Sequence, residues 1–380
     1  MKRKIIIIGT AHPLRGGLAN YNERIAKAFI ENGDEVTIYN FSLQYPGFLF
    51  PGKTQYSSEP TPQNLDIKTI VNSVNPFNWI KIGIKIKKLK PELVIIKFWI
   101  PFMAPCLGTI ARIAKKNKHT KIVSILDNII PHEKRIGDKA LSNYFVKSVD
   151  GFVAMSKSVL TDIETFDKQK PKLFNPHPLY DNFGEIVSKE KAKENLELEQ
   201  ETNYLLFFGL IRDYKGLDLL LEAFADERFR KMPLKLIVAG EFYSDKEKYY
   251  EIVNKNNLKE SVIFTNDFVP DSKVADYFCA SDIVVQPYKD ATQSGVTQIA
   301  YHFEKPMLVT DVGGLAEIVP KEVGYVVKPD ITEIADSIID FYENSKEADF
   351  VKGAQKEKLK YSWKKMLETI DELEKGEGIG

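Results

Sequence analysis

Short apolar segments alternate with amphipathic helical patterns along the whole sequence, and this alternation constrains the fold more than any other feature. A strand that is apolar throughout is buried on both faces, which is typical of a parallel sheet covered by helices. The pattern therefore predicts an α/β protein with parallel sheets. The predicted strands are residues 5–8, 36–41, 93–98, 122–126, 152–155, 204–208, 236–239, 262–265, 283–286, 307–310 and 325–327.

The alternation pauses once, and the pause divides the chain into two halves. Between residues 174 and 186 the sequence is dense in Pro, Asn and Gly, as a linker is. Each half is long enough to hold its own core, so we predict two α/β domains, residues 1–182 and 183–345, with a ligand cleft between them. A long helical pattern follows in residues 346–380. An irregular insertion at residues 43–63 is either a lid or binding loop, or an ordinary surface loop.

The composition excludes several classes of protein. The 380 residues are 43% hydrophobic and 28% charged, and the formal net charge is zero, which argues against a general nucleic-acid binder. The two cysteines, Cys106 and Cys279, are far apart, so neither a zinc site nor a disulfide framework is expected. The apolar run at the start ends at Gly9, too short for a leader peptide, and no stretch is long enough to span a membrane. We therefore expect a cytoplasmic protein.

A predicted strand, a glycine turn and a predicted helix follow one another between residues 204 and 224. The turn carries Arg212 and Lys215. In an open α/β sheet, ligands bind where strands end and helices begin. A guanidinium and an ammonium at such a junction suit a phosphate or a diphosphate. The alternative is that both side chains are solvated loop cations.

A second junction of this kind lies between residues 283 and 298. The strand ends at Gln286, and a helix begins near Gly295 with Ser294 or Thr292 as its N-cap. The free N–H groups of that helix start favour an anion. One anion could meet them together with the two cations, because the carboxyl ends of parallel strands share one edge of a sheet. The candidate binding residues are Arg212, Lys215, Gln293, Ser294, Gly295, Val296, Thr297 and Gln298.

The first strand opens into a loop that ends at Gly16 and Gly17, where the first helix starts. Main-chain N–H groups there can face an anion, although a simple tight turn would explain the two glycines equally well. The loop is not GxGxxG, and Asn40 rather than an acidic residue ends the second strand, so a nicotinamide dehydrogenase is not favoured. The Walker A pattern of nucleotide hydrolases is also missing.

These motifs, in this order, resemble glycosyltransferase family 4 over nearly the whole chain. The resemblance rests on G-x-I-R-x-Y-K-G-L-x-x-L-L-x-A-F from residue 209, on K-P-M-L-V-T-D-V-G-G-L-A-E-I-V from residue 305, and on P-x-x-G-G from residue 13. It implies the GT-B fold, in which two Rossmann-like domains face a cleft. Residues 1–182 would form the acceptor side and residues 183–345 the donor side, with the helix of residues 346–380 crossing back to the first domain.

The resemblance also implies a function. A sugar would move from a nucleotide-sugar donor to a glycan or lipid-linked acceptor, with retention and without a metal or a cofactor. Arg212 and Lys215 would hold the donor diphosphate, and Gly16 would approach it from the opposite domain. The predicted enzyme is of the hexosyltransferase type.

Two departures from the family pattern concern the catalytic groups. Members carry two glutamates separated by seven residues, and counting back from the Lys-Pro strand places these at Ala291 and Ile299. A Thr-Gln-Ser-Gly-Val turn replaces that motif here, and Gln298 could hydrogen-bond a ribose. Many members also place a histidine where this chain has Asp127, and His132 follows shortly after. Asp127 and His132 are the catalytic candidates, but His132 could equally be a loop histidine bonded to the backbone.

Two other functions stay open on the sequence. The missing glutamates favour a non-catalytic nucleotide-sugar binding protein. A nucleotide-sugar epimerase of the same fold would need an acid–base cluster that is not evident. His12, His177 and His302 do not assemble into a metal site by their spacing.

The segment of residues 79–90 mixes Ile with Lys. Read as a helix it is basic and amphipathic. It is a peripheral contact with the inner face of a membrane, a core-packed helix with a solvated lysine face, or both.

Overall fold

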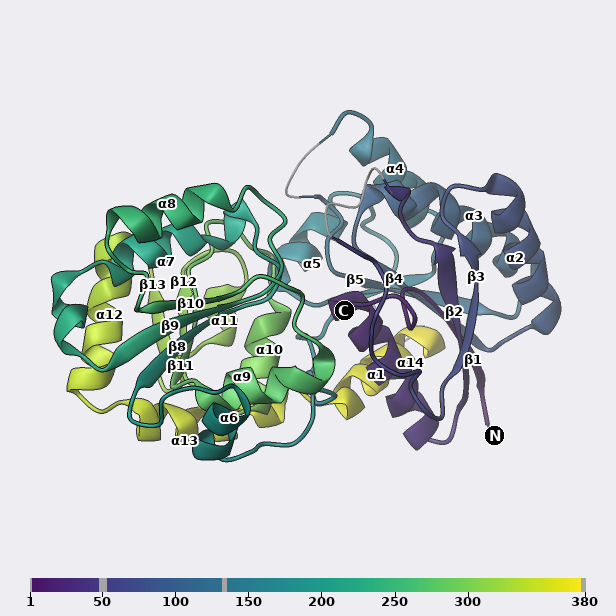
Figure 1. Cartoon of the computed structure of the whole chain (residues 1–380). Helices are drawn as coiled ribbons and strands as arrows, with labels where there is room; N and C mark the ends of the chain where they lie inside the picture. Colours follow the sequence, from purple (N-terminus) through teal and green to yellow (C-terminus); the bar gives the residue numbers. More distant parts are fainter. Residues whose placement is uncertain (1, 48–52, 132–134, 377–380) are drawn as a thin grey trace. The chain divides into compact units, whose positions relative to one another are not determined.

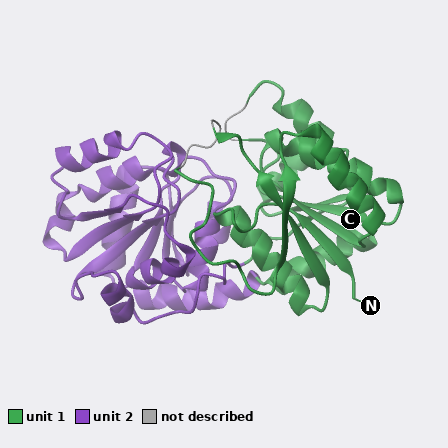
Figure 2. Cartoon of the chain, turned by 45° about the vertical axis from the view of Figure 1, so that its right-hand side comes forward, with its two compact units in different colours: residues 1–178, 362–380 green, residues 179–361 purple. Residues whose placement is uncertain are grey.

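The structure, a computed structural model, describes residues 2–47, 53–131 and 135–376. The chain forms two compact units: residues 1–178 with 362–380, called unit 1, and residues 179–361, called unit 2 (Figure 2). Each unit holds one parallel sheet that helices cover on both faces (Figure 1). This confirms the predicted α/β class with two Rossmann-like, parallel-sheet domains.

The sheet of unit 1 has seven parallel strands in the order β3-β2-β1-β4-β5-β6-β7. Its central strands are the continuous apolar runs of the sequence, and every residue of β4 is buried. The strands are β1 (Lys4–Ile8), β2 (Glu35–Leu43), β3 (Asp66–Asn72), β4 (Leu93–Phe98), β5 (Lys121–Leu126), β6 (Gly151–Ala154) and β7 (Lys172–Phe174). The helices are α1 (Gly17–Glu31), α2 (Pro76–Leu89), α3 (Ala104–Ala114), α4 (Asp138–Val146), α5 (Lys157–Glu164) and α14 (Trp363–Lys375).

The sheet of unit 2 has six parallel strands in the order β10-β9-β8-β11-β12-β13, so it repeats the strand order of unit 1. The strands are β8 (Asn203–Phe208), β9 (Leu234–Ala239), β10 (Val262–Thr265), β11 (Ile283–Gln286), β12 (Met307–Thr310) and β13 (Gly324–Val327). The helices are α6 (Lys189–Asn195), α7 (Leu217–Phe224), α8 (Glu247–Lys255), α9 (Val274–Ala280), α10 (Gly295–His302), α11 (Leu315–Ile318), α12 (Ile331–Glu343) and α13 (Glu347–Glu357).

Two strands of unit 1 were not predicted. β3 lies at the edge of the sheet and most of its residues are partly or fully exposed, so it lacks the continuous apolar run by which the others are recognised. β7 has only three residues.

The single long helix predicted near the C-terminus is wrong. The structure has two helices there, α13 and α14, and Ser362 caps the second by accepting a hydrogen bond from the N–H of Lys365 at 3.3 Å. α13 packs against α10, which is why unit 2 extends to Tyr361 and not to residue 345. α14 packs against β5, β6 and β7 of unit 1. Its Asp371 and Glu374 bind Arg3 at 2.6 and 2.8 Å.

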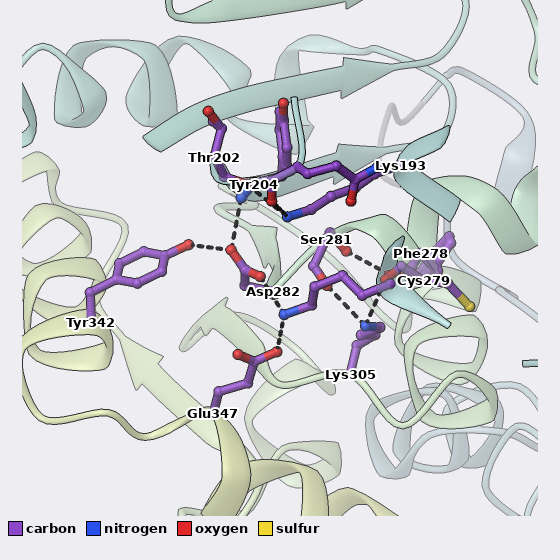
Figure 3. A network of polar contacts seen from close by, with 12 residues as sticks. Lys193, Thr202, Tyr204, Phe278, Cys279, Ser281, Asp282, Lys305, Tyr342 and Glu347 are labelled. Carbon is purple, nitrogen blue, oxygen red and sulfur yellow. Dashed lines mark hydrogen bonds and ion pairs between the residues drawn. The ribbon is translucent and has the colours of Figure 1, made fainter. Parts of the chain in front are cut away.

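A buried polar network lies at the opposite end of the unit 2 sheet from the carboxyl ends of its strands (Figure 3). Asp282, with only 2% of its side chain exposed, precedes β11 and accepts hydrogen bonds from the N–H of Tyr204 at 2.7 Å, Lys189 at 2.6 Å and the Tyr342 hydroxyl at 3.1 Å. Lys189 also pairs with Glu347 at 2.6 Å. One carboxylate thus ties together α6, β8, β11 and α12.

Within the described residues, every helix is too short or too polar to span a bilayer.

Candidate functional site

Each sheet has a point where the strand order reverses, and in unit 2 this point lies between β8 and β11. The two strands pair in parallel, so the segments that follow them leave the sheet at the same edge. Ligands of open α/β sheets bind at such a reversal. Both junctions identified in the sequence, residues 209–216 and 287–295, are brought together here.

Glycines allow the two segments to approach closely. Gly216 has φ +68°, and a Cβ at this position would lie 1.9 Å from the carbonyl oxygen of Pro287. Only glycine combines that backbone conformation with that contact. The N–H of Lys289 donates to the carbonyl of Tyr214 at 2.7 Å and fixes the same arrangement.

Lys215 and the start of α10 meet beside Gly209. A Cβ on Gly209 would lie 3.1 Å from Lys215 Nζ and 3.6 Å from a methyl group of Val296 in the first turn of α10. The predicted convergence of Lys215 with this helix start is therefore present in the structure. The aromatic ring of Tyr288 lies 5.6 Å from the ammonium.

Lys215 is a buried cation that no carboxylate neutralises. Its relative exposure is 9%, and among the described residues no ion pair involves it. Burial, together with the nearby positive charge of Arg212, lowers the pKa of Lys215 to about 8. The Arg212 guanidinium lies over the ring of Tyr243, 5.2 Å from its centre, and likewise has no carboxylate partner in the described chain. Two cations held together in this way favour the binding of an anion beside them.

The start of α10 is capped as the sequence predicted, by Ser294. Its hydroxyl accepts a hydrogen bond from the N–H of Val296 at 3.2 Å and donates to Gln286 Oε1 at 2.7 Å. The Thr297 hydroxyl donates back to the Ser294 carbonyl at 2.5 Å. Both hydroxyls are therefore used within the fold, and what this helix start offers a ligand is its positive dipole end. Gln293 and Gly295 flank the cap, and Gly295 contacts the ring of Tyr180.

Gln298, another predicted binding residue, is fully buried on α10. Neither its Oε1 nor its Nε2 has a hydrogen-bond partner among the described residues.

We expect Gln298→Met to raise the stability of the protein, because it removes a buried amide without hydrogen bonds and keeps a similar volume. The gain should be about 1 kcal/mol, measured by urea unfolding. Ser294→Ala is the matched comparison, since it removes a hydrogen-bonded cap from the same helix and should cost about 1 kcal/mol. Equal losses in both variants would mean that the amide of Gln298 has partners.

In unit 1, Gly16 and Gly17 lie at the carboxyl end of β1, beside the strand reversal between β1 and β4. Gly16 has φ +99°, and a Cβ built there would have no described atom within 4 Å. The described residues therefore leave open space beside Gly16. Asn40, at the end of β2, holds the preceding loop through hydrogen bonds with the N–H of Ala11 and the carbonyl of His12, each 3.0 Å long.

The described part of the insertion packs against the same loop. Leu14 and Tyr56 form an antiparallel bridge. The N–H of Arg15 donates to the carbonyl oxygen of Gln55 at 3.0 Å, and the N–H of Ser57 donates to the carbonyl oxygen of Pro13 at 2.8 Å. The insertion thus supports the glycine loop. Residues 48–52 lie outside the described chain.

Asp127 lies at the carboxyl end of β5 and pairs with Lys97 of β4, whose Nζ is 2.8 Å away. Lys97 is 2% exposed, its burial lowers its pKa, and its ammonium lies 3.5 Å from the centre of the Tyr21 ring. Burial and the Lys97 charge lower the pKa of the neighbouring His177 to about 3, so this histidine is neutral. His132, the other catalytic candidate, lies outside the described residues.

Sequence reasoning missed Lys97. A lysine inside the apolar strand LVIIKF was the available signal, since a charge in a buried strand is rare unless it is paired. Its partner Asp127 lies 30 residues further along the chain, and only the pairing of β4 with β5 brings the two together.

Comparison with known families matches residues 188–357 to the family Glycosyl transferases group 1. The matched part of the chain contains Arg212, Lys215 and α10, so this part is similar to glycosyl transferases of group 1.

Several curated proteins are similar in sequence. O-antigen chain mannosyltransferase C of Escherichia coli is 22% identical over 302 residues, which cover 78% of this chain and 76% of that protein. GDP-mannose:glycolipid 4-beta-D-mannosyltransferase of Xanthomonas campestris pv. campestris is 30% identical over 193 residues, 50% of either chain. An uncharacterized glycosyltransferase of Methanocaldococcus jannaschii is 31% identical over 134 residues, 35% of this chain and 36% of its own. The match thus spans about a third to a half of the last two relatives.

Solved structures share the fold over nearly the whole chain. Sucrose-phosphate synthase from Thermosynechococcus elongatus has a TM-score of 0.77 at 15% identity and covers 98% of both chains. HepE of Anabaena, solved in complex with UDP-glucose, has a TM-score of 0.74 at 15% identity, covering 97% of this chain and 98% of its own. At such low identity these likenesses show the fold, which is GT-B.

Proposed function

We propose that the protein is a glycosyltransferase that moves a sugar from a nucleotide-sugar donor to a glycan or lipid-linked acceptor, with retention and without a metal. The observation that carries the proposal is a pair of cations, Arg212 and Lys215, at the carboxyl edge of the unit 2 sheet beside the start of α10. Neither has a carboxylate partner among the described residues. The match to group 1 glycosyl transferases covers both residues and supports the proposal.

The chemistry follows from where charge develops. When the bond between the sugar and the diphosphate breaks, negative charge grows on the leaving oxygen and positive character on the sugar carbon. Lys215 is already desolvated and Arg212 already lies near it, so the two cations stabilise that negative charge with little reorganisation. The same two cations supply the counter-charge that a divalent metal supplies in other transferases.

The remaining predicted residues would act beside the diphosphate or at the acceptor. Gln293, Gly295 and Val296 border the helix start that would face the diphosphate. Gly16 and Gly17 belong to the other unit, and their approach to the donor stays a prediction. The acceptor hydroxyl would be positioned by Asp127, whose carboxylate Lys97 orients, and by His132.

The kind of donor and acceptor is suggested by the relatives. The named activities of two of them are mannosyl transfers, one onto a glycolipid, and HepE was solved with UDP-glucose. We therefore propose a UDP- or GDP-hexose as the donor, an acceptor at or near the cytoplasmic face of a membrane, and no nucleic-acid partner.

The function is tested by the release of nucleoside diphosphate from UDP- and GDP-hexoses, with and without glycan and glycolipid acceptors. We expect release that depends on the acceptor and is unchanged by EDTA. Binding without release in every combination would favour the non-catalytic alternative, and interconversion of the donor sugar would favour an epimerase. Loss of turnover in EDTA that manganese restores would contradict metal independence.

Donor affinity should fall as the pH rises through about 8. The anion binds the protonated form of Lys215, whose pKa of about 8 lies within the accessible range, and a bound diphosphate raises that pKa. Affinity is therefore fully present below pH 8, and it should decrease about tenfold between pH 7 and pH 9. Isothermal titration with UDP-glucose and GDP-mannose measures this decrease. Lys215→Arg keeps its charge and should show a flat profile. A wild-type profile that is equally flat would remove Lys215 from the site.

A further inference from the structure

One face of helix α2 (Pro76–Leu89) is buried against the rest of unit 1. Ile82 and Ile86 are 3% and 0% exposed. Gly83 lies so close to α3 that a Cβ there would be 2.7 Å from Cβ of Ile113. These residues form the face of α2 that packs against the rest of unit 1.

The outer face of the same helix carries a second set of apolar side chains. Phe77 is 83% exposed, Ile80 44% and Ile84 42%. Their spacing of three and four residues places them in one stripe along the helix. Nowhere else in the described chain does one helix or strand expose so many large apolar side chains. Isolated exposed apolar residues need no explanation, but a stripe on one element does.

Lysines border this stripe and no acidic residue accompanies them. Residues 76–90 contain five lysines and no Asp or Glu. Lys85 is turned toward the Tyr39 ring, with its Nζ 5.3 Å from the ring centre. The other lysines are exposed and make no ion pair within the described residues. They are Lys81, Lys87, Lys88 and Lys90.

A second basic segment adjoins the end of α2. The side-chain amide of Asn117 donates to the carbonyl of Lys87 at 3.4 Å and so places the turn after α3 beside the last turn of α2. Lys116 and Lys118 of that turn are exposed and carry no ion pair in the described structure. The apolar stripe therefore has exposed lysines of two neighbouring segments beside it.

We propose that this surface of α2, the stripe Phe77–Ile80–Ile84 with its flanking lysines, docks on an anionic phospholipid bilayer. The helix would lie parallel to the membrane plane, with the apolar side chains entering the acyl boundary and the ammonium groups meeting lipid phosphates. A second copy of the chain fits less well, because a symmetric contact would place lysines against lysines. The inference rests on surface chemistry alone and does not depend on the proposed transferase activity.

The test is co-sedimentation of the full chain with vesicles of phosphatidylcholine alone and of phosphatidylcholine with 30% phosphatidylglycerol. We expect binding to the anionic vesicles that 0.5 M NaCl reduces strongly. The triple variants Phe77→Ser/Ile80→Ser/Ile84→Ser and Lys81→Gln/Lys87→Gln/Lys88→Gln should each weaken it on the order of tenfold or more.

The matched control is Lys352→Gln/Lys356→Gln/Lys364→Gln, which removes the same charge from exposed positions on α13 and α14 and should bind like the wild type. Thermal shift with UDP-glucose, GDP-mannose or both should be the same in all variants, which separates this result from the test of function. Equal binding of the wild type to both kinds of vesicle, or an equal loss in the control variant, would overturn the proposal. So would light scattering that shows a dimer abolished by the serine substitutions.

Discussion

Replacing Arg212 or Lys215 by alanine is expected to cost about 2–4 kcal/mol of transition-state stabilisation, a loss of roughly 30- to 1,000-fold in kcat/KM. Each substitution removes a cation that the fold brings to the carboxyl edge of the unit 2 sheet, where the leaving diphosphate would develop its charge. Donor affinity, measured by titration with nucleotide-sugar, should fall with the rate. A double variant that turns over like the wild type would exclude this diphosphate site.

The loss of function should not be accompanied by a loss of stability. The lowered pKa of Lys215 shows that its charge is unfavourable in the folded protein without a ligand. Lys215→Met should therefore unfold at the same temperature as the wild type or a higher one, while it binds donor no better than Lys215→Ala. Lys255→Ala, at an exposed position on α8 of the same unit, is the control for removal of one charge. A Lys215→Met variant that is clearly less stable would mean that the ammonium has a structural partner.

Asp282→Ala is expected to destabilise unit 2 by about 3–5 kcal/mol, because it leaves a buried ion-pair network without its central carboxylate. Lys189, the N–H of Tyr204 and the hydroxyl of Tyr342 would all lose their acceptor at once (Figure 3). Burial lowers the pKa of Lys189, but the Asp282 carboxylate more than offsets this effect, so the pKa is raised. Burial and the same carboxylate both raise the pKa of Tyr342. Urea unfolding measures the loss.

Asp336→Ala is the comparison for this result. Asp336 also accepts from an arginine, Arg228, at 2.7 Å, but both side chains of that pair are about half exposed. Exposed ion pairs contribute about 0–1 kcal/mol, so this variant should unfold nearly like the wild type. If the two variants lost similar amounts of unfolding free energy, burial would not be the reason why the Asp282 network stabilises unit 2.

Local sequence was sufficient for the central strands and for residues at both strand-to-helix junctions of unit 2. A buried strand of a parallel sheet is apolar along its length, so runs such as Leu93–Phe98 could be recognised without knowledge of their neighbours. The turn with Arg212 and Lys215, and the cap at Ser294, follow from residue types that have strong local preferences. The edge strands β3 and β7 were not predicted, because β3 is mostly exposed and β7 has only three residues.

The properties that matter for chemistry were decided by tertiary structure. The pKa of Lys215 falls because β8 and β11 become neighbours and bury it beside Arg212, and the sequence contains no signal for that burial. Lys97 gains Asp127 as a partner only through the pairing of β4 with β5.

The polar centres at both ends of the unit 2 sheet depend on strand order in the same way. Asp282 joins residues 189, 204 and 342. The buried amide of Gln298 has no hydrogen-bond partner among the described residues. The sequence by itself determined which segments become strands and helices and which cations stand at their ends, because those choices depend on residues close along the chain. Only the folded arrangement decided which charges are desolvated and which are paired, since these depend on residues that meet through the order of strands.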